Sequence, residues 1–228
     1  IMVNKYDYLI LGGGVAGVTA AETIRERLPN ATICLVTDEQ HPLYSRVLLP
    51  AYLKKRINRE QLFLRTGDDF FKKRIDFRIH HEASLIEMRF REVKFTNHQA
   101  LYFDKLLIAT GGRPKPWGRP EDQDVLFRLQ TIADADRLRE SLPYIHYPIV
   151  IGSSFIALEF LEIFVKNNIT PRVFSRDQYF FSHILDPIGG RLIRENFETY
   201  DIEADFGETV SGINRETGGI SLLTEKLW

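Results

Sequence analysis

The sequence predicts an α/β protein with two similar halves, and three observations support this prediction. Residues 6–11 form a short apolar run that ends at a glycine-rich turn, as buried parallel strands do. Apolar residues at helical spacing follow that turn, and a second apolar run spans residues 32–36. The same order of strand, turn, helix and strand returns at residues 148–151, 154–166 and 172–174. Two such repeats predict two βαβ units, each within a mainly parallel sheet.

The segment between the repeats adds further elements to the first half. Residues 67–74 are expected to form a helix, and residues 76–103 contain several short strands. Residues 105–109 then return as another buried strand. In the second half, only three charged residues interrupt the apolar surface of the helix at 154–166, so we expect that helix to be mostly buried.

Glycine and proline crowd together at residues 111–118, which is typical of a domain boundary. We therefore expect a first domain at residues 1–113 and a second domain at residues 114–228.

Composition and charge exclude several kinds of protein. The 228 residues, 44% of them hydrophobic, can bury a core in one large or two small domains. The 30 Lys and Arg residues balance 31 Asp and Glu residues, so no long-range field favours nucleic acid or an acidic membrane. Cys34 is the single cysteine, which excludes an internal disulfide, and we expect it to pack in the core. No membrane span, signal peptide or pattern of metal ligands is recognisable, so a cytoplasmic protein without a metal is expected. The sequence does not indicate an oligomeric state.

The first glycine-rich turn carries the strongest chemical signal. Gly12, Gly14 and Gly17 have the GxGxxG spacing directly between a strand and a helix. The first glycine permits a tight turn, the second lets the backbone approach a pyrophosphate, and the third lets the helix pack on the strand. Asp38 ends the second strand, where its carboxylate can bind ribose hydroxyls, and Glu39 is the neighbouring candidate. Ordinary turn glycines are the alternative, but the combined context favours a dinucleotide site.

Three segments resemble one family of flavoproteins. Residues 12–17 (GGGVAG), 41–46 (HPLYSR) and 107–114 (LIATGGRP) resemble the FAD- and NAD(P)-binding pyridine nucleotide-disulfide oxidoreductases. The chain is most similar to the branch without a redox disulfide, which includes rubredoxin and ferredoxin reductases, apoptosis-inducing factor and the flavin module of nitrite reductases. The resemblance covers essentially the whole chain and implies two Rossmann-like dinucleotide-binding domains. It is looser in the second half.

The resemblance implies a role for several residues in binding FAD. Arg46 would reach the flavin phosphates, although a solvated loop charge is the alternative for this residue. Ala83 would meet the adenine through its backbone, and the turn at 109–111 would pass close to the cofactor unless it is a plain strand end. The residues implied in FAD binding are Gly12, Gly14, Val15, Ala16, Gly17, Asp38, Glu39, Arg46, Ala83, Ala109, Thr110 and Gly111.

The disulfide enzymes of this family carry a Cys-x-x-x-x-Cys pair after the first acid, and this chain has none. Cys34 lies before Asp38 and has no partner, so a dithiol relay is excluded. Electrons would pass directly from the flavin to an external acceptor.

The second glycine motif is degraded. Residues 152–159 (GSSFIALE) are similar to the GGGYIGLE pattern of the family, but Ser154 stands where the backbone should approach a pyrophosphate. Glu159 could help to place a nicotinamide against the flavin, or it is an exposed helix charge. The residues implied at this turn are Gly152, Ser154, Phe155, Ile156 and Glu159.

The strand after the second motif does not end in the expected acid. Phe174 is followed by Ser175 and Arg176. That pair could bind the 2′-phosphate of NADP(H), or it forms a surface turn. The second nucleotide site is therefore either functional or decayed.

The resemblance also sets an expectation for the C-terminus. In the family, the chain returns to the FAD domain after the nicotinamide domain, and nothing after Gly190 matches that segment. We expect a nearly complete second domain without the return segment, from either a truncated or a short protein, and an incomplete flavin end.

The resulting hypothesis is an FAD-dependent oxidoreductase that takes hydride from NAD(P)H and passes electrons to a redox protein or a small acceptor. The alternatives are a flavin-binding redox or interaction module with a decayed nicotinamide site, and a structural fragment. The sequence assigns no catalytic residue.

Overall fold

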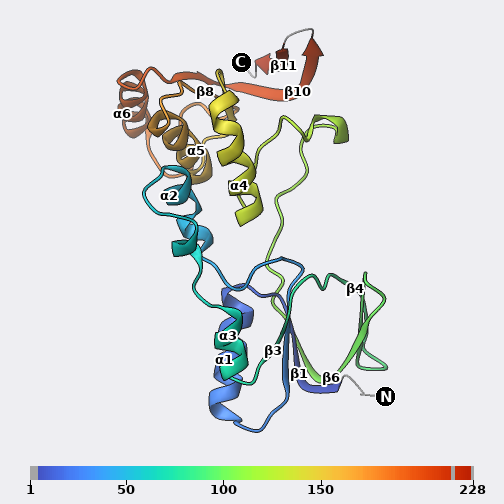
Figure 1. Cartoon of the computed structure of the whole chain (residues 1–228). Helices are drawn as coiled ribbons and strands as arrows, with labels where there is room; N and C mark the ends of the chain where they lie inside the picture. The colour runs from blue at the N-terminus through green and yellow to red at the C-terminus, as the bar shows by residue number, and fades with distance from the viewer. Residues whose placement is uncertain (1–4, 217–218, 227–228) are drawn as a thin grey trace. The chain divides into compact units, whose positions relative to one another are not determined.

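The computed structural model describes residues 5–216 and 219–226 (Figure 1). The chain divides into two compact units, one made of residues up to 45 with 59–113, the other of residues 46–58 with those from 114 onward.

The first unit is built on a six-stranded mixed sheet. The strand order is β3-β2-β1-β6-β5-β4, and the first four of these strands run parallel while β5 and β4 are antiparallel. The predicted βαβ unit at the N-terminus is confirmed. The strands are β1 (Lys5–Leu11), β2 (Ile33–Val36), β3 (Asp76–Arg78), β4 (Ala83–Glu87), β5 (Glu92–Phe95) and β6 (Ala100–Ile108).

Both faces of this sheet are covered by apolar side chains. Helices α1 (Val15–Arg27) and α3 (Gly67–Lys72) pack on one face, where Ile10 and Phe70 belong to a buried cluster. A second cluster covers the other face and includes Cys34, which is fully buried as predicted. Each face of β1 and β2 therefore contributes to a core, which explains why these strands read as continuous apolar runs.

The strand at residues 100–108 differs from the sequence prediction. One nine-residue strand, β6, replaces the separate strands expected before and after Asp104. Leu101 and Phe103 alternate with exposed residues, and β6 pairs with β1 from Lys5 opposite Tyr102 onward. The charge of Asp104 does not interrupt the strand because its exposed side chain forms an ion pair with Lys5 at 2.9 Å.

The second unit repeats the βαβ order, as predicted. Its parallel sheet has the order β7-β8-β9, and a separate antiparallel hairpin follows. Within the described residues, β7 pairs with β8 alone. The elements are α4 (Ile132–Ser141), β7 (Ile149–Ile151), α5 (Phe155–Lys166), β8 (Arg172–Ser175), α6 (Pro187–Glu198), β9 (Glu203–Phe206), β10 (Glu208–Glu216) and β11 (Gly219–Lys226).

Residues 46–58 pack in the second unit, although the sequence predicts them to lie in the first domain. Helix α2 (Leu49–Leu53) buries Tyr52 and Leu53 against this unit, and the Tyr52 hydroxyl donates to Asp136 at 2.8 Å. The remaining short helices are 3-10 turns at Arg46–Leu48, Glu60–Leu62, Pro120–Asp122 and Leu142–Tyr144.

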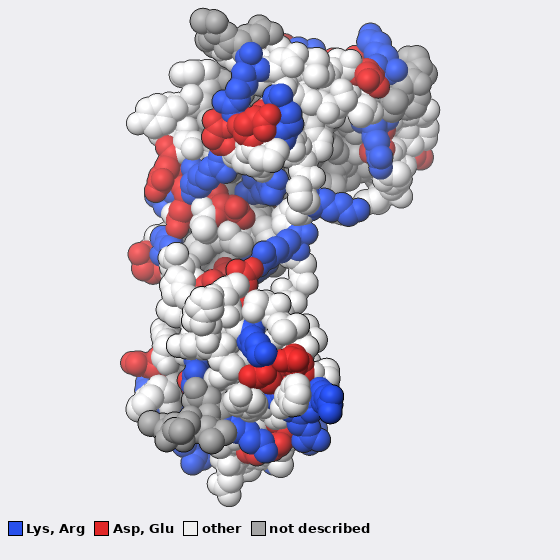
Figure 2. All heavy atoms as spheres, turned by 90° about the vertical axis from the view of Figure 1, so that its right-hand side faces the viewer, with Lys and Arg blue, Asp and Glu red and all other residues white. Residues whose placement is uncertain are grey.

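Helix α5 is less buried than its composition predicts. Leu161, Ile163 and Phe164 are buried, but Phe155 and Ile156 in the first turn are more than half exposed. Phe155 lines a pocket instead of packing in the core, so its side chain remains accessible. Elsewhere on the surface, acidic and basic side chains lie interspersed on the face shown in Figure 2, in keeping with the net charge of −1.

Candidate nucleotide-binding sites

The first glycine turn is fixed by backbone contacts. Gly12 follows β1 with φ of +117°, a conformation that favours glycine. A Cβ on Gly12 would lie 2.2 Å from the carbonyl oxygen of Ala109, and one on Gly17 would lie 1.9 Å from the carbonyl oxygen of Gly12. Only glycine therefore fits at these two positions. The contacts join the turn to the end of β6 and to helix α1.

Gly14 has a different environment. It is the N-cap of α1 in extended conformation, and a Cβ there would meet no atom within 4 Å. Val15 and Ala16 are exposed in the first helical turn beside it. The N-terminal N–H groups of a helix lack partners within the helix, so this open space suits a phosphate group.

The predicted ribose acid lies at the end of β2, and a basic residue contacts it. The Asp38 carboxylate accepts a hydrogen bond from Arg113 at 2.6 Å, and Arg113 also lies 3.7 Å from Glu82, next to Ala83 at the start of β4. Glu39 accepts a hydrogen bond from the Tyr44 hydroxyl. Arg113 thus joins two predicted adenosine-binding segments; it lies in the segment 107–114 that resembles the family, but the sequence assigns it no role.

The end of β6 contributes the last of the predicted residues that lie in the first unit. Ala109 donates its N–H to Leu11 at 2.7 Å, so the turn of Thr110 and Gly111 begins next to the glycine turn. Gly111 has φ of +68°. Arg46 begins a 3-10 helix that belongs to the second unit.

The second glycine turn has the same backbone geometry as the first. Gly152 has φ of +120°, and its N–H donates to Phe174 at 2.8 Å, as that of Gly12 donates to Val36 at 2.8 Å. Ser154 caps α5 in the extended conformation of Gly14. The serine therefore adds a side chain without changing the path of the backbone.

A pocket of about 440 Å³ opens at the carboxyl ends of β7 and β8. Ser154, Phe155, Ser175 and Arg176 line it, as expected for a nucleotide site on an open parallel sheet. Asp177 also lines it and accepts a hydrogen bond from the Ser153 hydroxyl. This acid could not be singled out from the sequence because it lies three residues beyond Phe174, the last residue of the predicted strand.

The predicted Glu159 belongs to an ion cluster on α5. The ammonium group of Lys54, whose side chain is only 6% exposed, lies 2.9 Å from Glu159 and 2.7 Å from Glu162. Burial lowers the pKa of Lys54, but the two carboxylates outweigh this effect and raise it above its usual value. Lys54 therefore stays charged at neutral pH and fixes Glu159. The sequence offers only a weak signal for it, since it is one of two adjacent lysines.

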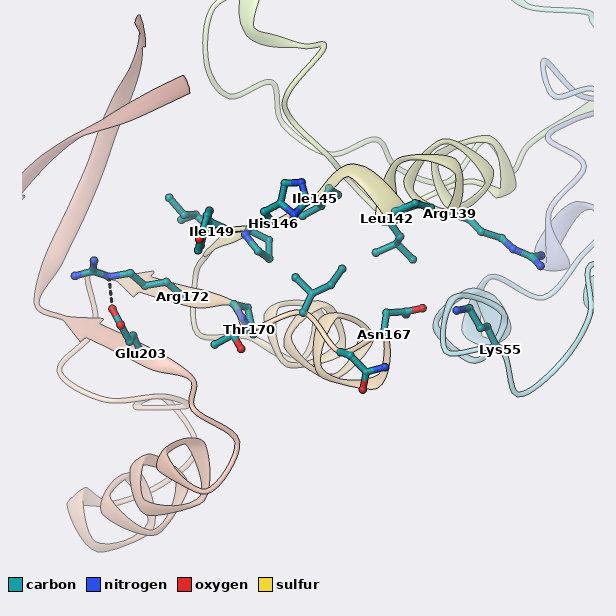
Figure 3. Close-up of a pocket in the computed structure, with 16 residues that line it drawn as sticks. Lys55, Arg139, Leu142, Ile145, His146, Ile149, Asn167, Thr170, Arg172 and Glu203 are labelled. Carbon is teal, nitrogen blue, oxygen red and sulfur yellow. Dashed lines mark ion pairs between the residues drawn. The ribbon is translucent and has the colours of Figure 1, made fainter. Parts of the chain in front are cut away.

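A larger cavity, of about 1030 Å³, lies at the opposite ends of the strands (Figure 3). Ile149, Arg172 and His146 line it, and an ion pair joins Arg172 to Glu203 at 3.4 Å. Ligands of open α/β sheets bind at the carboxyl ends of the strands, so the smaller pocket is the better nucleotide site. Among the residues in the structure, no cluster of His, Cys, Asp or Glu could hold a metal, and no helix has the length and apolarity to cross a membrane.

Comparison with known proteins identifies relatives that are similar to this chain in amino-acid sequence. The epsilon subunit of NADH-dependent phenylglyoxylate dehydrogenase from Aromatoleum evansii is 24% identical over 224 residues, which are 98% of this chain and 53% of that protein. Putidaredoxin reductase from Pseudomonas putida is 31% identical over 167 residues, 71% of this chain and 40% of that protein. The chain thus spans about half of these relatives, or less.

Comparison with solved structures also identifies similar reductases and oxidases. The complex of putidaredoxin reductase with putidaredoxin contains a chain with a TM-score of 0.86 and 26% identity, over 96% of this chain and 55% of that one. Water-forming NADH oxidase from Lactobacillus brevis, bound to NADH, has a TM-score of 0.89 over 96% of this chain and 50% of that one. At 19% identity, this second likeness concerns the fold.

The family model for pyridine nucleotide-disulphide oxidoreductases matches residues 6–226, which confirms the resemblance found in the sequence. The chain belongs to the pyridine nucleotide-disulphide oxidoreductase family.

Proposed function

We propose that this chain forms the nucleotide-binding part of a flavin-dependent oxidoreductase, with FAD at the first glycine turn and NAD(P)H at the second. Reductases of this family use FAD and NAD(P)H. The observation that carries the proposal is the shared geometry of the two turns, each with a first glycine at positive φ between a parallel strand and a helix N-terminus.

The first site fits the pyrophosphate of FAD. Gly12 and Gly17 hold the turn, and the missing side chain of Gly14 leaves open space before the N-terminus of α1. Val15 and Ala16 would contribute backbone N–H groups, Asp38 or Glu39 would bind the ribose, and the backbone at Ala83 would meet the adenine. We assign the remaining contacts to Arg46 at the flavin phosphates and to the turn at Ala109, Thr110 and Gly111.

The second site would hold the nicotinamide nucleotide. Gly152, Ser154, Phe155 and Ile156 form the turn, and Ser175 and Arg176 lie at the adenosine end. Bound flavin supplies the redox chemistry, accepting a hydride from the nicotinamide and releasing electrons to an acceptor. Lys54 would orient the Glu159 carboxylate through their ion pair, so that Glu159 can hydrogen-bond the nicotinamide.

We propose a redox protein as the acceptor, because the similar putidaredoxin reductase forms a complex with putidaredoxin. A flavin module with a decayed nicotinamide site is the second candidate. Ser154 favours this candidate, since its side chain occupies the approach that Gly14 leaves open in the first turn.

The test begins with reconstitution of the purified chain with FAD. After gel filtration, the protein fraction should retain the absorbance of oxidised flavin, and anaerobic addition of NADH or NADPH should bleach it. Flavin that is retained but not bleached would favour the second candidate, a flavin module with a decayed nicotinamide site. Loss of all flavin, with no binding of ADP in a calorimetric titration, would contradict the proposal at both sites.

A further inference from the structure

The two glycine turns and the strands that follow them correspond residue by residue. The shared hydrogen bonds match Gly12 with Gly152 and Val36 with Phe174. The next residues, Thr37 and Ser175, are both buried, 5% and 3% exposed.

The buried hydroxyls continue the correspondence. Thr37 accepts the N–H of Glu39 at 3.2 Å, and Ser175 accepts the N–H of Asp177 at 3.1 Å. Asp177 is therefore the counterpart of Glu39, and Arg176 is the counterpart of Asp38. An arginine replaces the first acid in the second turn, but the second acid remains.

The second turn differs from the first at the residue that lies between the first and second positions of the glycine motif. At Gly13, a Cβ would lie only 2.9 Å from the Cβ of Thr37. The second turn has Ser153 at this position, and the counterpart of Thr37 is Ser175, which lacks the methyl group of threonine. The Ser153 hydroxyl donates a hydrogen bond to the Asp177 carboxylate. This bond fixes a carboxylate whose side chain is 16% exposed in the wall of the pocket.

We propose that Asp177, held by Ser153, selects NADH over NADPH at the second site. The inference rests on the proposed nicotinamide function of that site. An acid at the end of the second strand binds ribose hydroxyls, whereas a 2′-phosphate would add negative charge beside a fixed carboxylate. Arg176 alone would attract that phosphate, but Asp177 offsets its charge within the same pocket.

The other charged groups of the pocket do not reverse this balance. Glu208 lines the pocket as a further acid, with the ammonium group of Lys226 at 3.8 Å. His183 lies 3.7 Å from Asp177 but is 81% exposed. The fixed Asp177 carboxylate therefore determines the local preference.

The test uses two probes without the nicotinamide ring, ADP-ribose and 2′-phospho-ADP-ribose. They are titrated calorimetrically into the full chain in the presence of saturating FAD, so that the first site is already occupied. The wild type should bind ADP-ribose at least about tenfold more tightly, which corresponds to about 1.4 kcal/mol. Asp177→Asn should strengthen 2′-phospho-ADP-ribose by at least about tenfold, and adding Arg176→Ala should remove this gain. Asp201→Asn, a matched change of an exposed acid outside the pocket, should leave the ratio unchanged.

Ser153→Ala provides a second variant if Asp177→Asn folds poorly. Without its hydrogen bond the carboxylate can turn away, so the preference for ADP-ribose should fall. A wild type that prefers the 2′-phosphorylated probe, or an Asp177→Asn protein with an unchanged ratio, would overturn the inference and leave the nicotinamide site standing. A wild type that binds neither probe would overturn the nicotinamide site itself.

Discussion

Replacement of Gly14 by valine should abolish FAD binding while the protein stays folded. Gly14 has ordinary extended backbone angles, φ −76° and ψ −178°, which valine adopts readily. A Cβ at this position meets no protein atom within 4 Å, so the new side chain extends into the space proposed for the pyrophosphate. The structure thus separates the effect on binding from the effect on folding.

The two effects differ in size. Valine is a poorer N-cap than glycine, which costs about 1 kcal/mol of stability. Hydrogen bonds to a charged group contribute about 1.5–3 kcal/mol each, so loss of two to the pyrophosphate weakens binding by about 3–6 kcal/mol. Since about 1.4 kcal/mol is tenfold, affinity for FAD should fall by roughly two to four decades.

The assay compares flavin affinity with thermal unfolding in three variants. Gly17→Ala should destabilise the fold by about 1–3 kcal/mol or more, because its Cβ would lie 1.9 Å from the Gly12 carbonyl oxygen. Gly67→Ala, whose Cβ meets nothing within 4 Å, is the control that should bind and fold normally. A stable Gly14→Val protein that keeps wild-type affinity for FAD would refute the assigned site.

Three further predictions concern the cores and the ion cluster. Burial, and to a smaller extent the nearby Asp76, raises the pKa of Cys34 to about 12. Iodoacetamide should therefore alkylate this thiol only after unfolding, and rapid labelling of the native protein would contradict this prediction. Phe70→Ala should cost about 3–5 kcal/mol in urea unfolding because Phe70 is 1% exposed. Phe71→Ala should change stability by no more than about 0.5 kcal/mol because Phe71 is 82% exposed, and equal effects would contradict the orientation of α3. Lys54 lowers the pKa of Glu162, so Glu162 stabilises the fold above its unfolded pKa of about 4.3, and this contribution is lost as pH falls through the lower folded pKa. The stability difference between wild type and Glu162→Gln should therefore shrink under acidic conditions, and a difference independent of pH would show that the carboxylate charge is not responsible.

The fold could be predicted because its signals are local and repeated. The apolar runs and the glycine turn at residues 12–17 specify strand, turn and helix within a few residues of each other. The continuity of β6 through Asp104 could not be predicted, since it depends on pairing with β1 almost 100 residues away. The exposed first turn of α5 was also missed, because apolar composition does not reveal which residues face a pocket.

The candidate sites were less accessible to sequence reasoning. The glycines have a recognisable spacing, but Arg113, Lys54 and Asp177 act through partners distant in sequence. Arg113 meets Asp38 across 75 residues, and Lys54 meets Glu159 across 105. Such pairs become visible only once the chain is folded, and nothing in the residues around them marks a charged group as a partner.

The one-sided pairing of β7 has a practical consequence for work with this chain. Within the described residues, the strand has a neighbour only in β8, while Ile149 and Ile151 are 41% and 45% exposed. A free strand edge with apolar side chains is a template for pairing with another molecule. Concentrated samples should therefore self-associate through this edge, and dilute solutions are the safer choice for the binding measurements.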